Sequence, residues 1–577
     1  MNRKLFQSVR EYKRESILAP VFVILEVLME VLIPLQMAKI IDEGIQRQNL
    51  PYIIQMGLIL VVMAMVALFF GVKAGNYAAR AAAGFAKNLR HDIFYKIQEF
   101  SFKNIDRFST PSLVTRLTTD ITNVQMAYMM SIRLLFRAPA MILLSLVMIL
   151  TINVQIALVM LVLIPVLGGI LMFIAKKAHP HFVQVFDEYD VLNNSVQENV
   201  NAARVVKAYV REDFEIRKFH GISSVVYTLF TRAEKIVAWN SPTMQFTLYS
   251  VILIMVLVGG ESIVRGSMAV GELTSVIVYA LSILMSLMMV TFVFVMIMIA
   301  EASTDRITEV LDEVPEMQDP ADAVQEVPNG DIVFEHVDFS YAGEGGALAL
   351  KDVNLHIKSG QTVGIIGGTG SAKTSLVNLI PRLYDVTGGS VKVGGIDVRQ
   401  YGLEALRDQV SMVLQKNVLF TGTIYENIRW GDENATDEEV QKVCRLAQAD
   451  GFIQEFPNGY DTQIVEGGNN VSGGQKQRLC IARALLKKPK VLILDDSTSA
   501  VDTKTDALIR KAFREEIPDT TKIIIAQRIS SVEDADMIIV MDDGKINGIG
   551  TSAELLANNA IYREVYESQV KGGGEDE

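Results

Sequence analysis

Cysteine is scarce in this sequence: the 577 residues include two, Cys444 and Cys480. Neither has metal-ligand spacing or a histidine pair nearby, so we interpret both as reduced cytosolic thiols. Dense runs of lysine and arginine are also lacking, and 54 basic against 66 acidic side chains give a formal net charge of −12. A general nucleic-acid binder needs a basic face to neutralise phosphates, so we expect no nucleic-acid partner.

A cleavable signal peptide is not indicated either. The first residues, MNRKLFQSVREYKRES, are basic and amphipathic, and they lead into an apolar run too long for a signal peptide. No small-residue cleavage site follows. We therefore expect the N-terminus to lie at the membrane surface and to stay attached.

Apolar residues make up 50% of the chain, and they are distributed unevenly. A chain of this length exceeds what one core supports, so at least two domains are expected. Crossing about 30 Å of hydrocarbon takes about 20 apolar residues. Such runs lead us to predict an all-α transmembrane domain of six helices, at residues 17–38, 53–76, 134–152, 156–174, 244–264 and 273–300.

The links between these spans alternate in length and charge. Short links join spans one and two, three and four, and five and six, whereas long polar stretches follow spans two and four. By parity, both long stretches share a side with the two termini. Basic residues concentrate on that side, which the positive-inside rule makes cytoplasmic in a multi-pass protein of the plasma membrane. They include Arg3, Lys4, Arg10, Lys13, Arg14, Arg80, Lys87, Arg90, Lys96, Lys176, Lys177, Arg204, Lys207 and Arg211.

The long polar stretches have helical periodicity and few helix breakers, as in HDIFYKIQEFSF and SVQENVNAARVVKAYVRE. Helices of about 25 residues would carry each loop tip about 37 Å beyond the bilayer, at 1.5 Å per residue. The transmembrane domain is therefore expected to have long intracellular helical extensions that could touch a soluble domain.

Two carboxylates, Glu26 and Glu30, fall inside the first span, four residues apart. Burying a carboxylate in a membrane is costly without a partner or water, so such residues suggest a function. Two interpretations stay open: contact with a substrate, or the lining of a hydrated cavity. The sixth span is rich in methionine, whose flexible thioether suits varied apolar ligands, although plain packing explains any single methionine as well.

An acidic segment with three prolines follows the sixth span and indicates a domain boundary. Strands and helices alternate after it. We assign residues 1–312 to the transmembrane domain, 313–330 to a linker, 331–570 to an α/β domain and 571–577 to a disordered tail.

The stretch QTVGIIGGTGSAKTSLVNLI has an apolar strand, a glycine loop and a helix in succession, which is the arrangement of a P-loop. Backbone N–H groups and the helix N-terminus cradle phosphates there, the lysine reaches the β and γ groups, and the following threonine binds Mg²⁺. The candidate ATP-binding residues are Gly367, Thr369, Gly370, Ser371, Ala372, Lys373, Thr374 and Ser375. Ala372 replaces the usual glycine, and its methyl would crowd the loop if the backbone needs a positive φ.

A second buried strand, KVLILD, ends in Asp495. Ligands of open α/β sheets collect at the carboxyl ends of strands, so Asp495 is placed to hold Mg²⁺. Between the two motifs, NVSGGQKQRLCIARALL has a Ser-Gly-Gly-Gln turn that opens a helix. Its small residues permit close approach of a ligand, and the helix dipole favours an anion.

Together these motifs resemble those of an ABC exporter half-transporter, in which six membrane helices are fused to one P-loop ATPase domain. The resemblance covers nearly the whole chain. It implies an ATP- and Mg²⁺-dependent subunit that pairs head to tail with a second half-transporter, each ATP lying between the P-loop of one chain and the signature motif of the other. It also implies a lipid bilayer as environment and a small substrate that is moved by alternating access.

The resemblance further implies roles for individual residues. Intracellular helix tips would lie near Asn104 to Ser112 and near Asp187 to Asn194, while Arg116 and Asp120 follow the exporter pattern. In the ATPase domain the implied roles are as follows: Tyr341 stacks on adenine, Gln415 meets Mg²⁺, Ser472, Gly473, Gly474 and Gln475 form the signature motif, Ser499 and Asp502 belong to the D-loop, and Glu466 lies in the cross-talk loop.

Three positions depart from the family pattern together. Asp496 stands where the family has the glutamate that polarises the attacking water, and its side chain is shorter by one methylene, about 1.5 Å of reach. Gln527 stands where the family has the switch histidine, and an amide offers no imidazole. Ala372 is the third departure.

Two interpretations follow. In the first, the chain is the degenerate half of a heterodimer: its own site binds ATP and hydrolyses it slowly, while its signature motif completes a competent site on the partner. In the second, a homodimer has two weak sites and exports lipid or peptide. We favour the first, because the binding parts are kept while the hydrolytic parts change together. A non-transporting ATP-binding regulator is a third class. Amphipathic or cationic drugs, lipids and small peptides all fit as substrates.

Overall fold

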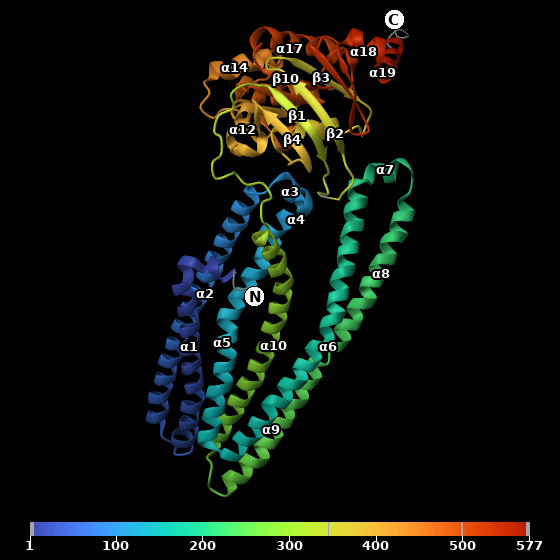
Figure 1. The fold of residues 1–577 in the computed structure, drawn as a ribbon. Helices are drawn as coiled ribbons and strands as arrows, with labels where there is room; N and C mark the ends of the chain where they lie inside the picture. Colours follow the sequence, from blue (N-terminus) through green and yellow to red (C-terminus); the bar gives the residue numbers. More distant parts are fainter. Residues whose placement is uncertain (1–4, 344, 498–499, 573–577) are drawn as a thin grey trace. The chain divides into compact units, whose positions relative to one another are not determined.

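The computed structural model describes residues 5–343, 345–497 and 500–572 (Figure 1). The chain forms two compact units. One contains the residues up to Glu99 together with Ser109–Glu313, and the other contains Phe100–Phe108 together with the residues from Val314 onward. The short segment Phe100–Phe108 thus belongs with the C-terminal unit, although both of its neighbours in sequence belong to the first.

The first unit is helical, and its described residues form six helical segments long and apolar enough to span a membrane. The predicted spans lie within helices α1, α2, α5, α6, α9 and α10, so the expectation of six is confirmed. These helices cover Lys13–Lys39, Leu50–Gln98, Ile121–Ile152, Val154–Asn201, Asn240–Val264 and Val270–Asp312.

Two groups of helices make up this unit (Figure 1). Helices α1, α2, α5 and α10 pack against one another, whereas α6 runs beside α8 (Glu212–Val237) as a long hairpin. At residues 238–239 the helix is interrupted by a turn, and α9 begins at Asn240. The interruption therefore lies before the fifth span, between α8 and α9.

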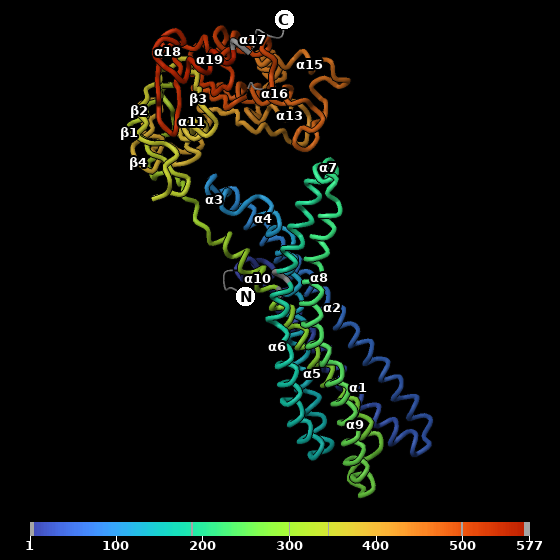
Figure 2. The backbone as a smooth tube through the Cα atoms, turned by 90° about the vertical axis from the view of Figure 1, so that its right-hand side faces the viewer, coloured from blue at the N-terminus to red at the C-terminus, as the bar shows by residue number. Residues whose placement is uncertain are grey.

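The two chain reversals differ in how well the sequence predicted them. The first, at α3 (Phe102–Phe108) and α4 (Thr110–Thr115), lies in the expected range. The expectation of a second tip near Asp187 to Asn194 is wrong, because α6 continues through these residues. The helix ends at Asn201, and α7 (Ala203–Ala208) then closes the hairpin (Figure 2).

The second unit contains two main sheets. The first has the order β2-β1-β4-β5 and is antiparallel, with strands Leu350–Ile357, Ile332–Phe339, Gly388–Val393 and Ile396–Asp397. The second has the order β12-β11-β3-β10-β9-β6, with strands Lys545–Gly550, Met537–Asp542, Thr362–Gly367, Thr521–Ile525, Val491–Asp495 and Val410–Val413. Its strands are parallel except β12, so the carboxyl ends of β3 and β9 lie at the same edge of the sheet.

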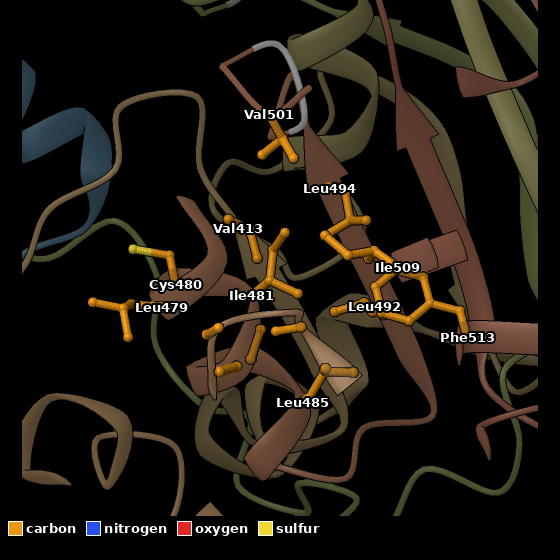
Figure 3. Close-up of a cluster of buried hydrophobic side chains, with 14 of the residues drawn as sticks. Val413, Leu479, Cys480, Ile481, Leu485, Leu492, Leu494, Val501, Ile509 and Phe513 are labelled. Carbon is orange, nitrogen blue, oxygen red and sulfur yellow. The ribbon is translucent and has the colours of Figure 1, made fainter. Parts of the chain in front are cut away.

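Helices cover the six-stranded sheet. The pair that positions the site is α16 (Gly473–Leu486) and α17 (Thr503–Glu516), whose apolar faces share a core with β9. Figure 3 shows Ile481 of α16 close to Leu492 and Leu494 of β9, with Phe513 of α17 beside the strand. β9 is buried along its whole length, and its residues are apolar up to the final one, Asp495.

Shorter helices complete the unit. They are α11 (Lys373–Asn378), α12 (Leu403–Gln409), α13 (Ile424–Ile428), α14 (Asp437–Leu446), α15 (Asp450–Glu455), α18 (Ser552–Asn558) and α19 (Ala560–Gly572). Helix α19 includes Lys571 and Gly572, which we had expected in the tail; residues 573–577 lie outside the described residues. A six-helix domain followed by an α/β domain is the predicted fold class, and it is confirmed.

Candidate nucleotide-binding site

The loop between β3 and α11 has the form predicted for a phosphate cradle. The Lys373 ammonium lies within it and donates to the carbonyl oxygens of Gly367 and Gly368, each at 2.8 Å. A Cβ on Gly367 would lie 2.2 Å from the Met541 carbonyl oxygen, so glycine is required there. Burial lowers the pKa of Lys373, although Asp495 and Asp496 oppose that change. A lysine cation held at this loop by two backbone carbonyl oxygens suits a nucleotide phosphate.

Ala372 occupies a left-handed backbone conformation, with φ 69° and ψ 26°. The condition set by the sequence, a positive φ at this position, is therefore met. An L-residue with a Cβ is disfavoured there by about 1–2 kcal/mol relative to its right-handed form, a cost that glycine does not have. The loop that leads into α11 is therefore under local strain at Ala372.

Thr374, at the start of the helix after the glycine loop, lies beside Asp495, at the end of β9, as the sequence predicts. The Thr374 hydroxyl donates to Asp495 Oδ1 at 3.2 Å. The pKa of the Asp495 carboxyl is raised, mainly by burial. The Thr374 hydroxyl and Lys373 oppose this change, whereas the charge of Asp496 adds to it. A hydroxyl and a carboxylate are oxygen ligands of the kind that Mg²⁺ prefers, so these residues fit that ion. They would hold the Mg²⁺ that neutralises phosphate charge.

Asp496 is held by the other unusual residue of the site. The Gln527 amide Nε2 donates to Asp496 Oδ2 at 2.7 Å, and the Gln415 side chain also hydrogen-bonds to Asp496. Asp496 has φ 51°, a left-handed conformation at the turn after β9. Burial raises the pKa of its carboxyl, while the two amides lower it. The three predicted residues Gln415, Asp496 and Gln527 thus form one cluster.

Tyr341 links the loop to an aromatic group that the sequence did not reveal. Its hydroxyl lies 2.9 Å from the Ser375 hydroxyl, and its ring centroid lies 5.1 Å from that of Tyr384. The Tyr384 hydroxyl in turn donates to Asp106 Oδ2 of α3 at 2.7 Å, and Phe102 of α3 packs on its ring. A continuous set of contacts therefore runs from the P-loop helix to the first loop tip.

The signature turn opens α16 with a reciprocal cap. Ser472 Oγ accepts from the Gln475 N–H at 3.3 Å, and Gln475 Oε1 accepts from the Ser472 N–H at 2.9 Å. A Cβ on Gly474 would lie 2.7 Å from the Ala500 carbonyl oxygen, whereas one on Gly473 would make an ordinary contact. Gly473 is exposed, so the N-terminus of α16 is accessible at this position.

Gln477 is a residue that sequence reasoning missed. Its amide donates to the Asp496 carbonyl oxygen at 3.3 Å and accepts from the Ala500 N–H at 3.2 Å. It therefore joins the signature helix to the end of β9. Its position two residues after Gln475, in the same motif, was the available signal.

The remaining predicted residues have simpler surroundings. Asp502 caps α17 and accepts from the Thr505 N–H at 2.9 Å. Hydrogen bonds from the backbone and side chain of Thr505 lower the pKa of the Asp502 carboxyl. Ser499 lies outside the described residues. Glu466 is exposed at the start of a short 3-10 turn.

Two family models match the chain: one described as the ABC transporter transmembrane region, at residues 16–299, and one described as ABC transporter, at residues 350–499. The uncharacterized ABC transporter ATP-binding protein YfiB of Bacillus subtilis (strain 168) is 36% identical over 574 residues, covering 100% of both chains. The chain is an ABC half-transporter. Its nucleotide-binding domain is that of an ATPase coupled to transport, and a half-transporter needs a second half to form the complete unit.

Two further comparisons bear on this half-transporter. The probable multidrug resistance ABC transporter ATP-binding/permease protein YheI of B. subtilis (strain 168) is 37% identical over 406 residues, 70% of this chain and 69% of the relative. The structure of a bacterial Atm1-family ABC exporter with ATP bound matches with TM-score 0.83 and 22% identity, over 96% of this chain and 99% of that one. The second comparison shows that the half-transporter has the exporter fold.

The two carboxylates in the first span of the half-transporter are paired with an arginine. Arg137 of α5 contacts Glu26 Oε1 through Nη1 and Glu30 Oε1 through Nη2, both at 2.7 Å. We did not single out Arg137, although an arginine inside an expected span was a signal of the same kind as the glutamates. Through Arg137 the two glutamates are brought together, and they join α1 to α5.

Arg116 and Asp120 also meet partners on another helix. Arg116 Nη2 donates to Glu309 Oε2 at 2.8 Å, and Asp120 accepts from Arg306 Nε and Ser303 Oγ, both at 2.8 Å. These contacts fasten the π-helical turn Arg116–Asp120, which precedes α5, to the last turns of α10, just before the linker. The half-transporter thereby connects its first loop tip to the helix that leads into the ATPase domain.

Proposed function

We propose that this chain is the degenerate-site subunit of a heterodimeric ABC exporter. Its own P-loop site holds ATP and Mg²⁺ and hydrolyses slowly, while its signature motif completes the competent site built on the partner's P-loop. The observation that carries the proposal is the bond from Gln527 Nε2 to Asp496 Oδ2 at 2.7 Å. The short carboxylate at the catalytic position is occupied by an amide, at the place where a water would have to be polarised.

Asp496 is poorly suited to this task. General-base catalysis needs a carboxylate within hydrogen-bond reach of the attacking water, and a displacement of about 1 Å is enough to lose much of the rate. Asp496 has about 1.5 Å less reach than a glutamate. Two amides, from Gln527 and Gln415, already bond to it.

Binding, by contrast, is supported by intact parts. Lys373 is anchored in the P-loop, Thr374 and Asp495 form an oxygen pair for Mg²⁺, and Tyr341 stands beside the P-loop helix. The signature turn keeps its reciprocal cap and an open glycine. These features support a chain that binds ATP at its own site and completes the partner's site with its signature motif.

Transport requires that ATP binding reaches the membrane helices. The route from Ser375 through Tyr341 and Tyr384 to Asp106 offers one path, because each contact lies within van der Waals or hydrogen-bond distance. ATP that favours the closed pair of ATPase domains would shift α3 and thereby the spans attached to it. The distribution of basic residues supports a cytoplasmic ATPase domain, so amphipathic or drug-like compounds would leave the cytoplasm.

Purification of the chain under two conditions tests the proposal. A tagged copy expressed in its native membrane should co-purify with a second half-transporter that has Glu and His at the positions of Asp496 and Gln527. The pair in lipid vesicles should hydrolyse ATP and drive flux, whereas the chain alone should hydrolyse slowly. If the chain alone forms a dimer with the full hydrolysis rate, the heterodimer proposal fails.

A further inference from the structure

One side chain of the C-terminal helix α19 holds the backbone around the switch position. Gln569 Nε2 donates to the Gln527 carbonyl oxygen at 2.8 Å, and Gln569 Oε1 accepts from the Ile529 N–H at 2.9 Å. A primary amide has both a donor and an acceptor, so a single side chain satisfies two backbone groups. We call this pair of bonds the α19 clamp. The two bonded groups belong to the residues on either side of Arg528.

The clamped segment has no regular secondary structure of its own. Strand β10 ends at Ile525 and the 3-10 turn η7 (Ile529–Ser531) follows, so Gln527 lies in an irregular connection. The turn η7 is fixed from another direction, because the Ser531 hydroxyl donates to Asp506 Oδ2 of α17 at 3.0 Å. With both ends fixed, the course of the connection depends on the bonds made within it. The α19 clamp supplies two of them.

Helix α19 is itself packed on the body that contains the site. Tyr562 of α19 is fully buried and belongs to the hydrophobic core that also contains Ile529 of η7 and Leu494 of β9. Val565 of α19 packs against the same core. Because α19, η7 and β9 share one core, the clamp is mounted on the same body as the end of β9.

The clamped backbone sets the direction of the Gln527 side chain. Its Nε2 donates to Asp496 Oδ2 at 2.7 Å, at the turn after β9. The bonds of Gln569 are made to backbone atoms, so they act on whichever side chain stands at position 527. Since a displacement of about 1 Å in a catalytic group can change a rate about 10²-fold, the course of this backbone matters to the reaction.

We propose that Gln569 is a positioning residue, which aims the side chain at position 527 toward the carboxylate at position 496. In this chain the aimed side chain is an amide, so the clamp keeps Asp496 bonded to Gln527. The aiming by Gln569 does not depend on how fast this site hydrolyses ATP. That the aimed amide keeps the site slow rests on the proposed function.

Hydrogen exchange tests the clamp without a measurement of activity. Gln569→Met keeps a long side chain that suits a helix but removes both bonds. Because Gln569 is exposed and water competes for these bonds, we expect a moderate effect: the Ile529 amide should exchange about tenfold faster in the full chain in lipid nanodiscs. Gln569→Glu keeps an acceptor and should be intermediate, whereas the matched control Glu564→Met, at an exposed position of α19, should change nothing. Unchanged exchange in Gln569→Met would overturn the clamp.

ATP cleavage at this chain's own site tests what the clamp does. The background is the assembled pair in which this chain has Asp496→Glu with Gln527→His, so that an imidazole is aimed at a carboxylate of full reach. Adding Gln569→Met should lower the rate constant for ATP cleavage about tenfold and leave ATP affinity unchanged, because the altered contact is made to position 527 and not to ATP. Gln569→Glu should fall between, and Glu564→Met should change neither quantity.

The same variants in the otherwise unaltered chain separate this inference from the proposed function. At a slow site Gln569→Met should change the rate less than about twofold, because the released amide did not assist cleavage. A tenfold loss there would support the positioning role and contradict the slow site. Unchanged rates in both backgrounds would overturn the positioning role. Parallel losses of ATP affinity and rate would also overturn it, since a purely structural defect lowers both.

Discussion

Replacing Asp496 with glutamate and Gln527 with histidine together should raise ATP hydrolysis at this chain's own site by about 10²-fold. The glutamate restores about 1.5 Å of reach, and a displacement of about 1 Å is associated with a loss of that size. The histidine removes the amide that bonds to Asp496 Oδ2 at 2.7 Å, a contact to a charged acceptor worth about 1.5–3 kcal/mol. A 10²-fold gain corresponds to about 2.7 kcal/mol of barrier, which lies within that range.

The assay follows the nucleotide bound to this chain rather than total turnover. The assembled pair is loaded with radiolabelled photoreactive ATP, and the ratio of ATP to ADP crosslinked to this chain is measured over time. Asp496→Glu alone should gain less, because Gln527 still bonds to the carboxylate. Asp496→Asn with Gln527→His is the matched control and should gain nothing. Unchanged ATP retention in the double variant would refute the explanation of slow hydrolysis.

Three further predictions test other parts of the account. Ala372→Gly should relieve about 1 kcal/mol of backbone strain and raise ATP affinity up to about fivefold in equilibrium binding; weaker binding would show that the left-handed alanine is not strained. Tyr384→Phe keeps the ring contacts but removes the donor to Asp106, so flux per ATP hydrolysed should fall about fivefold while ATP binding is unchanged; unaltered coupling would exclude this route. Arg137→Met should lower the free energy of unfolding by about 3 kcal/mol in thermal denaturation, because two carboxylates lose their partner, and changing both of these to glutamine as well should recover part of the loss.

Features encoded by contiguous residues were predictable. The P-loop could be recognised because strand, glycine loop and helix follow one another, and the membrane spans because each is a long apolar run. The pairing of Thr374 with Asp495 also followed from the sequence, since both motifs end strands of one parallel sheet. Whether Ala372 strains the P-loop depends on the φ angle at this residue, and the sequence does not determine that angle.

Features that depend on tertiary contacts were not predictable. Arg137 meets Glu30 across 107 residues of sequence, and Tyr384 meets Asp106 across 278. Nothing near Arg137 or Tyr384 in the sequence indicates these partners. The loop tip at α7 was misplaced because local composition decides where a helix can end, whereas packing of α6 against α8 decides where it does end.

The most direct test of the central claim compares Asp496→Asn with Gly473→Asp in the assembled pair. The first removes the carboxylate of this chain's own site, and the second places a negative charge at the signature turn, where a Cβ makes only an ordinary contact. Steady-state ATP hydrolysis should stay within about twofold for Asp496→Asn and fall more than about 10²-fold for Gly473→Asp. Equal losses in the two variants would mean that both sites carry the chemistry, and the account of a degenerate subunit would be wrong.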